Sequence, residues 1–346
     1  MNRFEWIATA AFGLEGVVAR ELARLGLDAK AENGGARFFG TFEDAFRANL
    51  HARCADRILL VMGRFEARSF EELFEGVRAL PWEDFIGEHT RFPVNGKCAR
   101  SQLMSVRDCQ AITKKAIVER LRGRYHTDWF AEDAETVSID VALHGDIAQL
   151  TLDASGTALN RRGYRTWNGE APLRETLAAA LVTLSPWRPG MPLHDPMCGT
   201  GTLMIEAAMR MAHRAPGLTR EFAIESWRGM PTDAFGDIRE QARAEFDPSR
   251  IEGISGSDID PEAVELANRH LKQAGLAGRV RFEVADMRDC RRAEPQGVFL
   301  CNPPYGERLS DRKACETLYH DMGQMLRANP GWSLSAITSH PGFERC

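Results

Sequence analysis

The chain has 346 residues, of which 44% are hydrophobic and 27% charged, and its formal net charge is −5. This balance favours a packed globular protein of two or three domains and excludes a disordered or fibrous chain. No uncharged run reaches the roughly 18 apolar residues that a membrane-spanning helix needs. The uncharged run at residues 6–14 is interpreted as a strand and turn, because Glu5 precedes it and a signal peptide would carry basic residues there. The eight cysteines are scattered without zinc-ligand spacing, so we expect reduced thiols in a cytoplasmic protein, with no metal and no membrane partner.

The first 153 residues alternate short strands with amphipathic helices, which indicates two small α/β units in succession. Strands are predicted at residues 4–9, 36–41, 57–65, 90–97, 136–143 and 147–153. Helices are predicted at residues 14–25, 42–49, 69–79 and 105–121. Ser69 is expected to cap its helix together with Glu72, which stands three residues further on and would complete a capping box.

Two local basic patches are hidden by the negative total charge. Residues 91–124 carry nine Lys or Arg side chains and two acids, a local net charge of +7. Such a run is usually a solvated helix face, but it can also bind the phosphate backbone of a nucleic acid. The second patch is Arg161, Arg162 and Arg165, in a Gly-rich polar segment that we interpret as a linker.

From residue 172 onward, strands alternate with helices, which predicts a parallel sheet. The first strand ends near Asp195, and a tight turn with Gly199 and Gly201 leads into a helix at 202–211. Such a turn lets the backbone approach a ligand at the carboxyl end of the strand. The turn lacks the third glycine of a dinucleotide fingerprint and the lysine of a P-loop, so a generic strand-to-helix turn is the alternative.

Two further acids each end one of the next two predicted strands. Asp258 can accept hydrogen bonds from the hydroxyls of a ribose, while Asp260 is expected to cap the helix that begins near Pro261. Asp286 can accept a hydrogen bond from an adenine amine. Either acid alone is weak evidence, and Asp258 could merely cap the helix that follows it. Three acids after three successive strands are a stronger indication of a nucleoside ligand.

The segment Asn302, Pro303, Pro304 and Tyr305 follows a fourth, buried strand. The prolines fix the backbone and remove donors, so the loop presents acceptors, namely the Asn302 side-chain oxygen and the Pro303 carbonyl. Tyr305 offers an aromatic face. Two acceptors beside a ring suit an amine on a planar base.

Together these motifs resemble class I S-adenosylmethionine-dependent amino-methyltransferases. Residues 92–117 resemble a THUMP RNA-binding domain, and residues 159–181 resemble the linker and following helix of the THUMP-bearing 23S rRNA guanine-N2 methyltransferase family. The resemblance covers nearly the whole chain and implies an α/β fold. The implied parts are an N-terminal ferredoxin-like unit at 1–52, a THUMP-like domain at 53–154, a linker at 155–170 and a Rossmann-like methyltransferase domain with a mostly parallel sheet at 171–346.

The resemblance also assigns roles to residues. The implied cofactor-binding residues are Asp195, Pro196, Cys198, Gly199, Gly201, Thr202, Asp258, Ile259, Asp286, Met287 and Asn302. The implied catalytic residues, which would hold the target base, are Asn302, Pro303, Pro304 and Tyr305. The residues expected to bind RNA are Lys97, Arg100, Lys114, Lys115, Arg161, Arg162 and Arg165, although the last three could instead steady the linker.

We therefore expect methyl transfer from S-adenosylmethionine to the N2 amine of a guanine in 23S rRNA or a large-subunit precursor. Adenine-N6 methylation of RNA or DNA is one alternative, because the Asn-Pro-Pro-Tyr loop suits that amine equally well. A non-catalytic RNA-binding ribosome-assembly factor is another. The chain departs from the family at its end, because the fold normally closes with a hairpin and the chain stops at Cys346, soon after a predicted strand at 332–339.

Overall fold

The computed structural model describes residues 2–165, 173–304, 312–340 and 342–345. The chain forms two compact units. The first comprises Met1–Leu159 together with Glu221–Glu240, and the second comprises Asn160–Arg220 and Gln241–Cys346. None of the helices in the described ranges is long and apolar enough to cross a membrane.

The first unit is built on one mixed seven-stranded sheet with the strand order β2-β3-β1-β4-β7-β6-β5. The strands are β1 (Phe4–Thr9), β2 (Ala29–Glu32), β3 (Gly35–Gly40), β4 (Arg57–Glu66), β5 (Val94–Ala99), β6 (Ile139–His144) and β7 (Ile147–Asp153). All neighbours pair antiparallel except β5 and β6, which are parallel. Of these strands, β2 was not predicted, because its sequence AKAE is only four residues long and contains no β-branched or aromatic residue.

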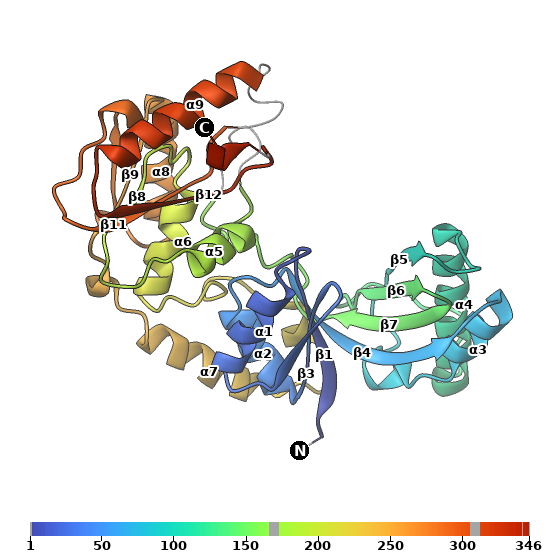
Figure 1. Cartoon of the computed structure of the whole chain (residues 1–346). Coiled ribbons are helices and arrows are strands. Elements are labelled where there is room, and N and C mark those ends of the chain that lie inside the picture. Colours follow the sequence, from blue (N-terminus) through green and yellow to red (C-terminus); the bar gives the residue numbers. More distant parts are fainter. Residues whose placement is uncertain (1, 166–172, 305–311, 341, 346) are drawn as a thin grey trace. The chain divides into compact units, whose positions relative to one another are not determined.

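Four helices pack on this sheet, as Figure 1 shows. They are α1 (Glu15–Arg24), α2 (Phe42–His51), α3 (Phe70–Arg78) and α4 (Val106–Tyr125), and a short 3-10 turn lies at Trp82–Asp84. The buried residues of α4 recur every three or four positions, which turns one face of this 20-residue helix to the sheet. The helix runs four residues beyond the predicted end at 121 and stops at His126, whose φ is +55°.

The predicted capping box of α3 is only half formed. The Ser69 hydroxyl accepts a hydrogen bond from the Glu72 amide at 3.2 Å, as expected. The Glu72 carboxylate, however, accepts from the amide of Arg68 at 2.6 Å and not from that of Ser69. The Glu72 carboxylate thus pairs with the backbone amide of Arg68, one residue before Ser69, and still satisfies a donor at the start of the helix.

Residues 221–240 pack with the first unit, whereas the bounds expected from the sequence place them in the methyltransferase domain at 171–346. The physical reason is an aromatic cluster. The ring of Phe235 stacks on Phe46 of α2, with 4.4 Å between the ring centroids, and Phe222 meets Phe46 edge-on at 5.7 Å. The segment thus contributes part of the hydrophobic core of the first unit.

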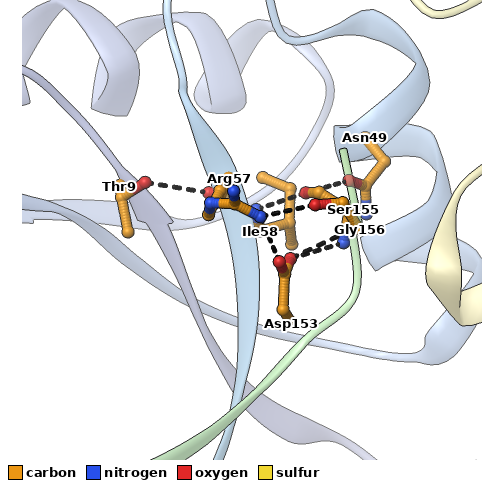
Figure 2. A network of polar contacts seen from close by, with 7 residues as sticks. All are labelled: Thr9, Asn49, Arg57, Ile58, Asp153, Ser155 and Gly156. Atoms are coloured by element: carbon orange, nitrogen blue, oxygen red, sulfur yellow. Dashed lines mark hydrogen bonds and ion pairs between the residues drawn. The ribbon is translucent and has the colours of Figure 1, made fainter. Parts of the chain in front are cut away.

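A buried polar network ties the start of β4 to the chain that follows β7 (Figure 2). Asp153 forms an ion pair with Arg57 and accepts hydrogen bonds from the amides of Ser155 at 2.9 Å and Gly156 at 3.1 Å. The Ser155 hydroxyl accepts from the Ile58 amide at 2.8 Å and lies 2.6 Å from the Asn49 side-chain oxygen. Burial raises the pKa of Asp153, although Arg57 opposes that effect. The network therefore fixes where the chain leaves the seven-stranded sheet.

The second unit contains a five-stranded, all-parallel sheet with the strand order β10-β9-β8-β11-β12. The strands are β8 (Leu193–Asp195), β9 (Ile254–Asp258), β10 (Arg281–Val284), β11 (Gly297–Cys301) and β12 (Trp332–Ala336). The longer helices of the second unit are α5 (Glu175–Leu184), α6 (Thr202–Met211), α8 (Pro261–Gln273) and α9 (Arg312–Arg327), whereas most of α7 (Thr232–Ala244) lies in the segment that packs with the first unit. Short 3-10 turns lie at Ala223–Ser226, Pro248–Arg250, Met287–Asp289 and Phe343–Arg345.

This strand order places a switch point between β8 and β11. From β8 the chain proceeds to β9 and β10 on one side, and it then returns to place β11 on the other side. In open parallel sheets, ligands bind outside the carboxyl ends of the strands at such a reversal. The predicted acids and the asparagine loop follow the carboxyl ends of these same strands.

Candidate functional site

A cavity of about 900 Å³ opens in the second unit at the carboxyl ends of its strands. Its wall includes all the residues predicted to bind the cofactor except Gly201, so segments far apart in sequence meet at one place. The wall residues that were not predicted are Leu173, Met197, Thr200, Leu203, Asp260, Glu262, Ala263, Leu266, Arg288, Ala314, Thr317, Leu318 and Asp321. Most of these lie on helices, where the sequence shows only ordinary amphipathic spacing.

The glycine turn between β8 and α6 requires its two glycines for different reasons. Gly201 has φ +79° and caps α6, and a Cβ there would lie 2.8 Å from the ring of Phe282 and 3.0 Å from Ala267. Gly199 has φ +51° and lines the cavity, and a Cβ there would meet no atom within 4 Å. Gly201 therefore permits close packing behind the turn, while Gly199 keeps the ligand side open.

Asp195, at the end of β8, is a buried carboxylate that faces the cavity without a described basic partner. It accepts one hydrogen bond, from the amide of Met197 at 3.1 Å. Burial raises the pKa of Asp195 well above its usual range, and the nearby Asp258 adds to the effect. A ligand with an ammonium group would supply the missing positive charge.

Asp258 connects the end of β9 to the glycine turn. One carboxylate oxygen accepts from the amide of Gly199 at 2.8 Å, and the other accepts from the amide of Asp260 at 3.0 Å. A carboxylate has about four lone-pair sites, so each oxygen can accept a further hydrogen bond. Asp260 caps α8 by accepting from the amide of Glu262 at 2.9 Å, as predicted. Asp258 is thus held rigidly and can still bind a pair of hydroxyls.

Asp286 is held by a neighbour that the sequence did not single out. Its Oδ1 accepts hydrogen bonds from the backbone amide of Arg288 at 2.9 Å and from Nε of the same residue at 3.0 Å, and the guanidinium completes an ion pair. Arg288 lowers the pKa of Asp286, which keeps this half-buried acid ionised. The apolar side chains of Ile259 and Met287 flank it in the wall of the cavity and can pack against a planar ring.

Asn302 follows β11 directly, on the far side of the switch point from Asp258. Its Oδ1 is buried and accepts no hydrogen bond from the described residues. A buried acceptor left unpaired costs about 1–3 kcal/mol, so this atom is suited to receive a donor from a ligand. Of the two prolines, Pro304 lines the cavity and Pro303 is buried outside the described wall. Tyr305 lies outside the described residues.

The cysteines beside these motifs are not activated. Cys198 lies in the glycine turn and Cys301 ends β11, and both are buried. Burial raises the pKa of both thiols, so they remain protonated near neutral pH. This agrees with their interpretation as small packing residues.

The predicted RNA-binding residues of the first unit differ in their surroundings. Lys97, Arg100 and Lys115 are exposed. Lys114 is half-buried, and its Nζ donates to the Glu132 carboxylate at 2.6 Å and to the carbonyl of Phe92 at 2.9 Å. Burial lowers the pKa of Lys114. Its charge is thus used inside the unit, so the structure does not support a contact between Lys114 and RNA.

In the linker, the three arginines also differ. Arg161 is exposed, but Arg162 is buried beside Glu206, with 3.5 Å between Nε and Oε1. Arg165 lies 3.5 Å from the Glu175 carboxylate and donates to the carbonyl of Leu173 at 3.0 Å. These contacts support the linker-steadying alternative for Arg162 and Arg165. The contact to Leu173 also fixes one edge of the cavity wall.

Three known domain families match successive parts of the chain. The RlmL ferredoxin-like domain matches residues 5–59, the THUMP domain matches residues 67–153, and the RMKL-like methyltransferase domain matches residues 162–346. A curated relative, "Putative RNA methyltransferase YpsC" of Bacillus subtilis (strain 168), is 42% identical over 99% of this chain and 90% of its own length.

Two solved structures are similar over the full length of the chain. One is described as a predicted N6-adenine-specific DNA methylase from Listeria monocytogenes, with 44% identity, a TM-score of 0.95 and coverage of 100% of this chain and 91% of that one. The other is described as "SMU.472, a putative methyltransferase complexed with SAH", with 40% identity, a TM-score of 0.95 and coverage of 100% of this chain and 92% of that one.

Proposed function

Because this chain belongs to the RMKL-like methyltransferase family, with an RlmL ferredoxin-like domain and a THUMP domain before the methyltransferase domain, we propose that it methylates the N2 amine of a guanine in 23S rRNA. The coarser activity is that of an S-adenosylmethionine-dependent RNA methyltransferase, in line with the relative named an RNA methyltransferase and the relative that binds SAH. Beyond this activity, the proposal specifies guanine as the target base and 23S rRNA as the substrate.

The cavity suits the parts of S-adenosylmethionine. Asp195 would bind the ammonium of the methionine part, and Asp258 would bind the ribose hydroxyls. Asp286 would accept from the adenine amine, with the adenine ring packed against Ile259 and Met287. When bound, the cofactor supplies an electrophilic methyl group on a positively charged sulfur.

The unpaired Oδ1 of Asn302 is the single observation that carries the proposed reaction. An exocyclic amine that donates to this atom would satisfy it and become more tetrahedral, because its lone pair would be withdrawn from the ring. The Asn302 oxygen would thereby aim the lone pair at the methyl group, so catalysis is mainly orientation. The methylated nitrogen carries a positive charge and readily loses a proton to water. No strong general base is needed.

The target base must be unpaired or flipped out of an RNA helix to reach this cavity, since its amine would otherwise be base-paired. Adenine-N6 methylation would use the same acceptor, and the Listeria monocytogenes relative is described as a predicted N6-adenine-specific DNA methylase. The THUMP match and the relative named an RNA methyltransferase favour RNA for this chain.

Nucleoside mass spectrometry of 23S rRNA from a deletion strain tests the proposal. We expect the strain to lack N2-methylguanosine at one position. Wild-type protein should restore it, and Asn302→Ala should not. An unchanged content of N2-methylguanosine, or the loss of N6-methyladenosine instead, would contradict the assignment. A thermal midpoint of the Asn302→Ala protein equal to that of the wild type serves as the control for folding.

A further inference from the structure

Trp129 is a large aromatic side chain on the surface of the first unit, just after α4. It is 80% exposed, whereas Trp6, Trp82, Trp227 and the other tryptophans in the described ranges are at most 7% exposed. A single exposed apolar residue is common and needs no explanation by itself. What distinguishes Trp129 is the way its backbone is held and the charge around it.

The backbone of Trp129 is fixed on both sides. The Thr127 hydroxyl accepts from the Trp129 amide at 3.3 Å and lies 3.0 Å from its carbonyl oxygen, to which it can donate. The next residue, Phe130, is buried and meets the rings of Phe92 at 6.2 Å and Tyr125 at 6.4 Å edge-on. The indole therefore projects from an anchored segment, so a ligand that stacks on it would have little backbone to order.

Charges of both signs stand near Trp129, because Asp128 precedes it and Glu132 and Asp133, which pair with Lys114 and His89, follow it. Arg122 and Arg124 form the last turn of α4, and Arg124 is exposed. Arg228, from the segment 221–240 that belongs to the same unit, lies 3.5 Å from the Tyr125 hydroxyl. The acids Glu119 and Asp128 both pair with the one side chain of Arg122, at 3.5 and 3.4 Å. Arg124 and Arg228 form no ion pair among the described residues, so their guanidinium groups can still bind phosphates.

We propose that Trp129 is a stacking platform for an unpaired base of the RNA substrate, with Arg124 and Arg228 bound to the flanking phosphates. This inference rests on the proposed function in one respect, namely that the substrate is RNA. Bases stack on aromatic side chains only where they are not already stacked in a duplex, and arginines beside the ring supply phosphate contacts. The substrate must then present single-stranded nucleotides at this site.

Fluorescence and binding measurements on the full chain test the platform. The probe is a single-stranded RNA of about 12 nucleotides, with a duplex of the same sequence for comparison. Trp167 lies outside the described residues, so all proteins carry Trp167→Phe, and the emission of the exposed indole can then be followed by its quenching with acrylamide. We expect the single strand to quench this emission and to protect it from acrylamide, and the duplex to do neither.

The variants separate stacking from other losses. Trp129→Leu keeps an apolar side chain without an aromatic face and should weaken binding of the single strand about 5- to 100-fold. Trp129→Phe should stay within about threefold, because it keeps a ring. Phe12→Ala removes another exposed aromatic of the same unit, one that is 94% exposed, and should leave binding unchanged. Thermal midpoints should be equal, because each changed side chain is exposed.

Three results would each overturn the platform. One is an affinity of Trp129→Leu for the single strand equal to that of the parent protein. The others are quenching by the duplex as strong as quenching by the single strand, and no binding of the single strand by the parent protein. RNA binding is measured without cofactor, so its outcome is independent of the reaction. If 23S rRNA is methylated as proposed while Trp129→Leu binds normally, the platform fails alone. If Trp129→Leu loses binding but N2-methylguanosine is not the product, the base assignment fails alone.

Discussion

Alanine at Gly201 should destabilise the second unit, whereas alanine at Gly199 should mainly weaken ligand binding. Both positions have a left-handed φ, +79° and +51°, which costs an alanine about 1–2 kcal/mol. At Gly201 the added Cβ would also lie 2.8 Å from Phe282 and 3.0 Å from Ala267, and such overpacking adds about 1–3 kcal/mol. We therefore expect a loss of about 2–5 kcal/mol for Gly201→Ala and about 1–2 kcal/mol for Gly199→Ala.

Thermal unfolding of the full chain measures the difference, and the transition that S-adenosylhomocysteine shifts identifies the second unit. For a unit of this size, 1 kcal/mol corresponds to about 2–4 °C. Gly201→Ala should therefore melt about 4–20 °C below wild type, and Gly199→Ala about 2–8 °C below. By calorimetry, Gly199→Ala should bind S-adenosylhomocysteine at least about tenfold more weakly, because its Cβ enters the cavity wall.

Two results would refute this reasoning. One is a Gly199→Ala protein that melts at a lower temperature than Gly201→Ala, which would mean that side chains pack more closely against Gly199 than against Gly201. The other is unchanged ligand affinity of Gly199→Ala, which would mean that the ligand does not approach this backbone.

Three further sites give independent predictions. Burial raises the pKa of Asp195, so the ligand-free second unit should lose stability as pH rises from the usual aspartate range through the raised value. Asp195→Asn should flatten this pH dependence of the thermal midpoint. In calorimetry it should also weaken S-adenosylhomocysteine binding about 10- to 100-fold. An unchanged affinity would contradict the assignment of an ammonium group as the partner of Asp195. Phe235→Ala should cost the first unit about 3–5 kcal/mol in urea unfolding, while Gly236→Ala, with open space around its Cβ, should not destabilise it. Asp153→Ala should destabilise the first unit by about 1–3 kcal/mol, because two buried amides and Arg57 lose their acceptor, and an unchanged urea midpoint would disprove the role of this network.

The sequence indicated that the site residues lie together because the geometry of a parallel sheet does most of the assembly. Asp195, Asp258 and Asn302 each follow a strand, and parallel strands bring their carboxyl ends to one edge. The periodic apolar positions of α1 and α4 were equally visible. Strand β2 was missed, since its four residues carry no pattern that distinguishes an edge strand from a turn.

Pairs of side chains that are far apart in the sequence could not be predicted from the sequence. Lys114 is paired with Glu132, 18 positions away, and Arg162 with Glu206, 44 positions away. The sequence does not show whether a basic side chain faces solvent or pairs with an acid inside the protein. A count of local charges therefore overestimated the basic surface available for RNA. Arg288 was missed for a related reason, because only the fold shows that its guanidinium turns back to Asp286.

Transfer of labelled methyl groups by the purified protein tests the central claim most directly. The substrate is 23S rRNA from a deletion strain, and the product is digested to nucleosides and separated against standards. We predict that the label is recovered as N2-methylguanosine, and that Asn302→Ala transfers none although its thermal midpoint equals that of the wild type. Label in N6-methyladenosine, or equal transfer by Asn302→Ala, would contradict the assignment of the buried Asn302 oxygen as the acceptor that holds the guanine amine.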